Sequence, residues 1–144
     1  MDAKEMWAVY ASQNAVDAPY EAWAFGCDTD ELAQLVLSGI KTATASAFPL
    51  YAVDGEALPE AGQYSVILDS NEDAVCIIRC IDVTVLPFSQ VSAEHAYREG
   101  EGDRSLEYWR SVHRRCFGQW MEEAGLVFSE DMLVVCETFQ RLFP

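Results

Sequence analysis

The sequence predicts an α+β fold in which helices surround a partly closed antiparallel β-barrel. Alternating apolar residues over 64–68 and a long apolar run over 74–86 flank a polar turn, which predicts a β-hairpin. Apolar residues recur at three- and four-residue steps from about Ser105 to Ala124, which predicts a long amphipathic helix. The pattern lacks regular βαβ alternation, and partial closure of a sheet removes exposed strand edges. A length of 144 residues suits a single domain, 1–144.

Local signals predict the remaining elements. In chain order these are a first helix over 4–14, a helix over 29–39, a strand from 41 toward 49, a short helix over 92–97 and a closing strand over 132–142. Asp28 stands three residues before Glu31, a variant of the capping box, so we expect it to cap the second helix. Gly55 and Pro59 predict a loop.

Net charge restricts the partners of this chain. It has 24 acidic and 9 basic residues, for a net charge of −15. Proteins that hold long nucleic acids neutralise several phosphates with Lys and Arg. The arginines between 98 and 115 are offset by acids of the same region, so binding of long RNA or DNA is disfavoured. No apolar run is long enough to span a membrane and no signal peptide is evident, which predicts a cytoplasmic protein.

The five cysteines are scattered, and four of them lie in apolar runs. They form no C-x-x-C pair and have no zinc-type spacing to histidine, so we expect no metal site and no cofactor. Cys76 and Cys80 lie on one predicted strand about 13 Å apart, at about 3.3 Å per residue, and cannot bridge each other. Reduced structural thiols are the expected state.

Two short runs stand out for chemistry. Lys41, one of only two lysines, lies just after the predicted second helix, in Gly39-Ile40-Lys41-Thr42-Ala43-Thr44. The simplest alternative is a helix cap at Gly39 followed by an exposed lysine. The second run is Glu99-Gly100-Glu101-Gly102-Asp103. It is either a solvated acidic loop in which Asp103 caps the next helix, or a set of acids placed near a ligand.

A family resemblance connects these runs. They occur in the order Gly39-x-Lys41-x-x-Thr44, His95-Ala96-Tyr97-Arg98-Glu99-Gly100-Glu101-Gly102-Asp103, Trp109-x-x-x-His113-x-x-x-Phe117 and Val134-Val135-Cys136-Glu137-x-Phe139. In this order they resemble the ASCH domain family, whose members are similar in fold to PUA RNA-binding domains. The resemblance runs from about Tyr20 onward. Residues 1–19 look like a helical extension found in one bacterial subgroup.

The resemblance implies a PUA-like barrel with a cleft at its mouth and a partner that is a nucleoside, a nucleotide or a short RNA. In small members that deacetylate acetylcytidine, the working residues are matched here by Lys41, Thr44 and Glu99. These three are our catalytic candidates. Position alone adds weaker ligand-binding candidates, which are Arg79, Tyr97, Glu101, Asp103 and His113. Whether Glu99, Glu101 or Asp103 is the working acid stays open, as does the oligomeric state.

Three functions fit these residues: recognition of a nucleoside or short RNA without chemistry, hydrolysis of an acylated nucleoside or of RNA, and an acidic domain that binds a protein partner. For amide hydrolysis, a neutral Lys41 would accept a proton from Thr44 or water, and Glu99 would protonate the leaving amine. Residues 41 and 44 would point to opposite faces of a regular strand. Convergence therefore requires that Lys41 lie before strand pairing begins.

Overall fold

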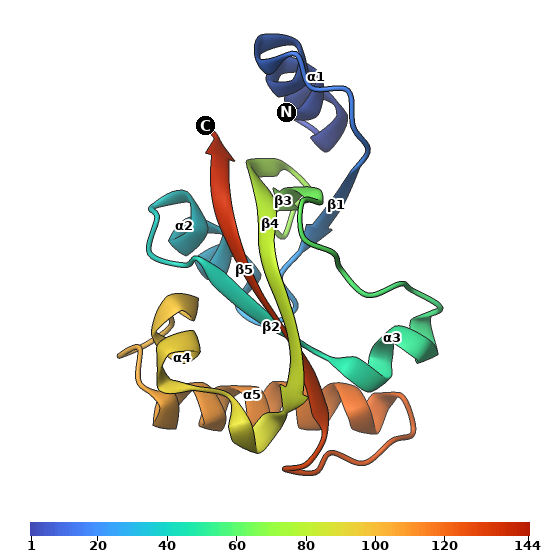
Figure 1. Cartoon of the computed structure of the whole chain (residues 1–144), viewed down its shortest axis with the longest axis vertical. Coiled ribbons are helices and arrows are strands. Elements are labelled where there is room, and N and C mark those ends of the chain that lie inside the picture. The colour runs from blue at the N-terminus through green and yellow to red at the C-terminus, as the bar shows by residue number, and fades with distance from the viewer.

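The computed structural model describes all residues from Met1 to Pro144. Five strands form one curled sheet in the order β1-β3-β4-β5-β2 (Figure 1). The strands are β1 (Tyr20–Ala24), β2 (Ala43–Ala47), β3 (Tyr64–Leu68), β4 (Ala74–Pro87) and β5 (Leu133–Phe143). The long β4–β5 pair shifts register twice, and such bulges bend a strand pair. The sheet consequently curves into a half-barrel, in agreement with the predicted fold class.

The helices surround this sheet. They are α1 (Ala3–Asn14), α2 (Thr29–Leu37), α3 (Phe48–Asp54), α4 (Ala93–Glu99) and α5 (Leu106–Glu123), with a 3₁₀ turn over Phe88–Gln90. In Figure 1, α1 lies near the end of β5, while α5 crosses the opposite end of the sheet beside α4. None of these helices combines the length and the apolar character needed to cross a membrane.

The largest core cluster lies between α5 and the sheet. Trp109, Phe117 and Met121 recur along one face of α5 and are almost fully buried. They pack with Phe88 and Val134, which come from the 3₁₀ turn and from β5. Burying side chains of this size contributes about 1.5–3 kcal/mol each. This packing fixes the face of α5 that also carries His113.

Two smaller clusters hold α2 and α1. Leu32 and Val36 of α2 pack on Ile67 and Ile78 of the central strands. On the other side, α1 contributes Met6 to a cluster with strands β3 and β4. The α2 packing positions the turn that precedes β2, which carries the lysine of interest.

The structure differs from the sequence-based predictions in four places. The parallel β1–β3 pair departs from an all-antiparallel barrel. Both β1 and α3 were missed, because β1 is a short edge strand and α3 buries no residue that would create a helical stripe. Asp28 adopts a left-handed backbone (φ 50°) and makes no side-chain cap. Asp103, one expected cap of the helix that follows, does not cap α5; Ser105 does, and its side chain accepts from the Tyr108 amide.

Candidate functional site

Lys41 lies in the turn between α2 and β2. Gly39 adopts φ +84°, a left-handed backbone that glycine tolerates, and the Lys41 amide then donates to the Leu35 carbonyl at 3.0 Å. Pairing of β2 with β5 begins only at Ala43. Lys41 thus precedes the regular strand, as convergence with Thr44 requires. Its side chain points into the protein, and the residue is only 2% exposed.

The Lys41 ammonium is held between two carboxylates. Its Nζ lies 3.3 Å from Glu99 Oε1 and 3.3 Å from Glu101 Oε2, and it also donates to the Glu99 carbonyl at 3.4 Å. The Phe25 ring lies beneath it, with its centroid 5.3 Å from Nζ. Both carboxylates are close enough to form ion pairs with this amine. The alternative of a solvent-exposed lysine is wrong.

A glycine brings the two acids to the lysine. Glu99 is the last residue of α4, and Gly100 follows it with φ +75°. A Cβ at position 100 would lie 2.9 Å from the Ile40 carbonyl oxygen. The backbone of the acidic run therefore packs directly against the residue before Lys41, so the side chains on either side of Gly100 can reach the ammonium.

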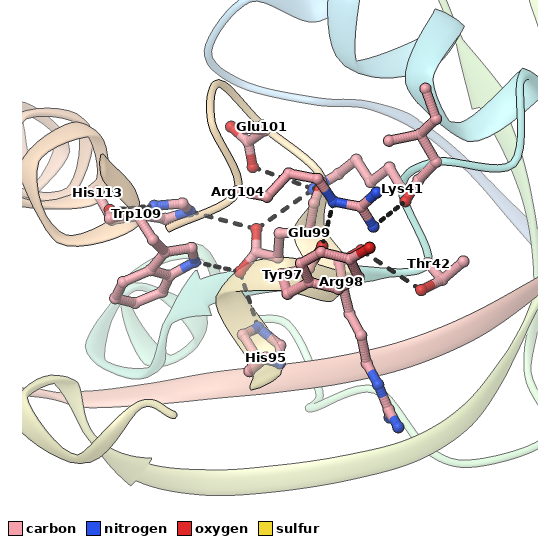
Figure 2. A network of polar contacts seen from close by, with 11 residues as sticks. Lys41, Thr42, His95, Tyr97, Arg98, Glu99, Glu101, Arg104, Trp109 and His113 are labelled. Atoms are coloured by element: carbon pink, nitrogen blue, oxygen red, sulfur yellow. Dashed lines mark hydrogen bonds and ion pairs between the residues drawn. The ribbon is translucent and has the colours of Figure 1, made fainter. Parts of the chain in front are cut away.

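Glu99 is the centre of the network shown in Figure 2. The residue is 1% exposed. One oxygen, Oε2, lies 2.8 Å from His95 Nε2 and accepts from Trp109 Nε1, while Oε1 faces Lys41 and lies 3.4 Å from His113 Nε2. Burial on its own would raise the pKa of Glu99. The Lys41 charge, His113 and the hydrogen bonds outweigh burial and hold the pKa well below its usual range.

The pKa of Glu101 is shifted in the opposite direction, upward. Burial is the main cause that raises its pKa, the negative charge of Glu99 adds to the effect, and Lys41 offsets only part of it. The surroundings therefore favour the ionised form of Glu99 and the protonated form of Glu101. Which of these acids protonates a leaving group stays a prediction.

His113 completes the network from α5. Its Nδ1 lies 2.8 Å from the Trp109 carbonyl, which can only accept, so Nδ1 carries a hydrogen. Its Nε2 then faces the Glu99 carboxylate, which favours a second proton. Burial lowers the pKa of His113, but Glu99 outweighs burial and the net pKa is raised. The ring also stacks on Trp109, with centroids 4.1 Å apart.

Three members of this network, His95, Trp109 and His113, were absent from the catalytic candidates that the sequence provided. His95 and Glu99 are four residues apart on α4, and Trp109 and His113 are four apart on α5. Such pairs share a helix face. That spacing was the available signal, but the apolar stripe on α5 favoured core packing, so His113 was only a weaker ligand-binding candidate.

Two cavities adjoin the site. A small one of about 50 Å³ is lined by Lys41, Thr44, Glu99, Glu101 and His113, among others. A much larger cavity of about 770 Å³ shares wall residues with it, including Thr44. The catalytic candidates therefore line one small cavity, beside a larger cavity that shares Phe25, Thr44 and Trp120 with it.

The other candidates lie elsewhere. Arg79 donates from Nε to the Gly62 carbonyl at 3.2 Å, on an exposed part of β4. Tyr97 is 57% exposed, and the Arg104 guanidinium stacks 3.7 Å from its ring centroid. Asp103 is exposed and accepts from the Ser105 amide at 2.9 Å. None of Arg79, Tyr97 and Asp103 lines either cavity.

The thiol prediction is wrong for one pair. Cys27 and Cys116 form a disulfide that joins the loop before α2 to α5, across 89 residues of sequence. Both cysteines line the small cavity. Cys76, Cys80 and Cys136 are free and buried, as expected. Sequence spacing gave no indication of the pair because the two positions meet only in the folded chain.

Oxygens of Glu99 and Glu101 and a nitrogen of His113 come within 4.8 Å of one another, a grouping that could ligate a metal ion. The Lys41 ammonium already lies 3.3 Å from both carboxylates. A divalent cation there would meet a fixed positive charge. The donor set therefore fits an ammonium better than a metal.

A curled half-barrel with flanking helices and a buried lysine–carboxylate cluster defines a small PUA-like domain. A family model described as the ASCH domain matches residues 21–142. The chain belongs to the ASCH domain family, whose PUA-like fold is often linked to RNA binding.

Solved structures agree with this assignment. The ASCH domain from Lactobacillus crispatus JV V101 is 31% identical, with a TM-score of 0.90 over 98% of this chain and 94% of that one. A protein from Enterococcus faecalis V583 is 36% identical, with a TM-score of 0.89 over 97% and 87%. A hypothetical protein at 14% identity and a TM-score of 0.57 shares the fold alone. None of the curated proteins matches the chain significantly.

Proposed function

We propose that this domain binds a nucleoside, either free or as one exposed unit of a short RNA, with the polar edge of the base beside Lys41 and Glu101. One observation carries the proposal: the cavity of about 770 Å³ shares its Thr44 wall with the pocket that contains the lysine. Its volume falls in the range of about 300–1,000 Å³ that is usual for small-molecule sites. Trp23, Phe25 and Trp120 line it and offer apolar ring surface to a base.

The charge of the cavity favours a nucleoside over a phosphate-bearing ligand. Its lining includes Glu21, Glu56 and Glu137 but no lysine, arginine or histidine. Lys41, which lines only the smaller pocket, is already paired with two carboxylates. Phosphate recognition draws its affinity from free basic groups. Cleavage of an RNA phosphodiester is therefore less well supported than recognition of an uncharged base.

Hydrolysis of an acylated nucleoside is the second candidate, favoured by the raised pKa of Glu101 next to Lys41. Water would add to the acyl carbonyl carbon as its proton passes to the Glu101 carboxylate. The Lys41 ammonium would stabilise the oxyanion. Collapse of the intermediate would break the carbon–nitrogen bond, and Glu101 would return the proton to the amine that leaves. Glu99 would stay anionic and hold Lys41 in place.

Binding and turnover can be separated with a small set of variants. Wild type, Lys41→Met, Lys41→Arg and Glu101→Gln are incubated with cytidine, acetylcytidine and a short single-stranded RNA. Calorimetry reports binding, chromatography reports products, and circular dichroism reports folding. Lys4→Met is the matched control, because Lys4 is the other lysine and is exposed.

The proposal expects folded wild type and Lys4→Met to bind a nucleoside, and Lys41→Met to lose that binding. Loss of turnover in Glu101→Gln with binding retained would favour the hydrolase. Absence of binding to every nucleoside and to the RNA would refute the proposal and leave the acidic partner-binding domain as the better interpretation.

A further inference from the structure

The large cavity is lined by Glu137, a polar residue that forms no ion pair with the Lys41 cluster. Glu137 of β5 stands directly opposite Thr44 of β2 in the antiparallel pair. Side chains of directly opposed residues emerge on the same face with Cβ atoms about 4.5–5.5 Å apart. Both residues line the large cavity. A ligand that touches Thr44 is therefore within reach of the Glu137 carboxyl group.

Glu137 has no basic partner. The ion pairs of the protein involve Glu94, Glu99, Glu101 and Glu130, and none of them includes Glu137. Burial and the nearby Glu21 raise its pKa, and a neighbouring Cys80 thiol opposes this only in part. A half-buried carboxyl group without a cation has unused capacity to accept hydrogen bonds. A bound molecule is the natural source of the missing donor.

The surroundings define which donor fits. Tyr51 of α3 and Ser46 of β2 line the same cavity, and their hydroxyl oxygens lie 2.6 Å apart, so one of these hydroxyl groups donates to the other. Of the three acids that line this cavity, Glu21 and Glu56 are exposed, and Glu137 is the half-buried acceptor without a basic partner. An acyl or phosphate group would place further oxygen lone pairs against it. An exocyclic amino group would satisfy it at little cost, because it brings N–H donors without the two carbonyl oxygens that flank the ring N–H of uracil.

We propose that Glu137 selects the base by accepting a hydrogen bond from an exocyclic amino group, so that amino-bearing bases bind in preference to uracil. The inference rests on the proposed nucleoside function and adds a specificity-determining residue to it. Uridine presents a carbonyl oxygen where cytidine presents an amino group. In the uridine complex, two acceptors would face each other, and one buried polar group would stay unsatisfied.

The test compares cytidine with uridine by calorimetry on the full chain. Wild type is expected to bind cytidine at least about fivefold more tightly, since an unpaired buried polar group costs about 1–3 kcal/mol and 1.4 kcal/mol is tenfold. Glu137→Gln supplies an amide that can donate to the uridine carbonyl, so the preference should shrink by a similar factor. Glu137→Asp keeps the charge but withdraws the carboxyl group, and it should also lose discrimination.

Glu122→Gln serves as the control, because Glu122 is exposed on α5 and lines neither cavity. Equal binding of cytidine and uridine by wild type would overturn the Glu137 assignment alone. An unchanged preference in folded Glu137→Gln would do the same. Absence of binding to both nucleosides would overturn the selectivity inference, and absence of binding to the short RNA as well would refute the proposed function.

Discussion

Replacement of Lys41 by methionine tests the buried charge cluster most directly. The residue is 2% exposed, and its Nζ lies 3.3 Å from both Glu99 and Glu101. Methionine fills similar volume without charge, so it leaves two carboxylates facing each other. Removal of one partner from a buried ion pair costs about 3–5 kcal/mol. The total stability of a domain is about 5–15 kcal/mol, so the variant should be markedly less stable.

Urea unfolding followed by tryptophan fluorescence measures this cost, with Lys4→Met as control. Lys4 is exposed, so its replacement should change the free energy of unfolding by less than about 0.5 kcal/mol. At about 2–4 °C per kcal/mol, Lys41→Met should also lower the Tm by roughly 6–20 °C. Lys41→Arg keeps the charge and should recover part of the loss.

The pH dependence has a definite sign. The wild-type pKa of Glu99 is depressed, so its contribution to stability is present above the unfolded pKa of about 4.3 and is lost as the pH falls through the folded value. Without the ammonium, the carboxylates lose the main group that keeps the pKa of Glu99 low. The difference in the free energy of unfolding between Lys41→Met and wild type should therefore narrow as the pH falls toward 4. A loss below about 1 kcal/mol at neutral pH, or a gap independent of pH, would contradict a buried ion pair.

Three further outcomes are expected. Because the pKa of Glu101 is raised, its ionisation costs stability above about pH 4.3. The free energy of unfolding of Glu101→Gln should therefore rise relative to that of wild type as the pH increases from there. Parallel pH–stability curves would contradict this. Gly100→Ala places a Cβ 2.9 Å from the Ile40 carbonyl oxygen at φ +75°, so the Tm should drop by several degrees, and an unchanged Tm would show that the two runs are not in contact. Replacing Cys27 and Cys116 by serine should lower the free energy of unfolding by about 3–5 kcal/mol, because the disulfide closes a loop of 89 residues. Mass spectrometry of the non-reduced wild type should give a mass two hydrogens below that of the reduced chain. A count of five free thiols would refute the disulfide.

The fold class was accessible from local patterns. The hairpin of β3 and β4 and the stripe along α5 have the periodicities of a half-buried strand pair and an amphipathic helix. Where an element buries little, as α3 does, this signal is absent and the element was missed. The β1–β3 pairing was also out of reach, because strand partners are chosen by packing over long sequence distances.

For the site, the sequence by itself determined the chemical inventory: a rare lysine after a glycine turn, and acids on either side of Gly100. It also narrowed the class of partner, because the net charge of −15 follows from composition alone and disfavours long nucleic acids. Only the tertiary structure decided that Lys41 is buried between Glu99 and Glu101, that their pKa values are displaced in opposite directions, and that Cys27 meets Cys116. The physical reason is that burial and electrostatic interaction depend on distance in space, and 58 residues of chain separate Lys41 from Glu99.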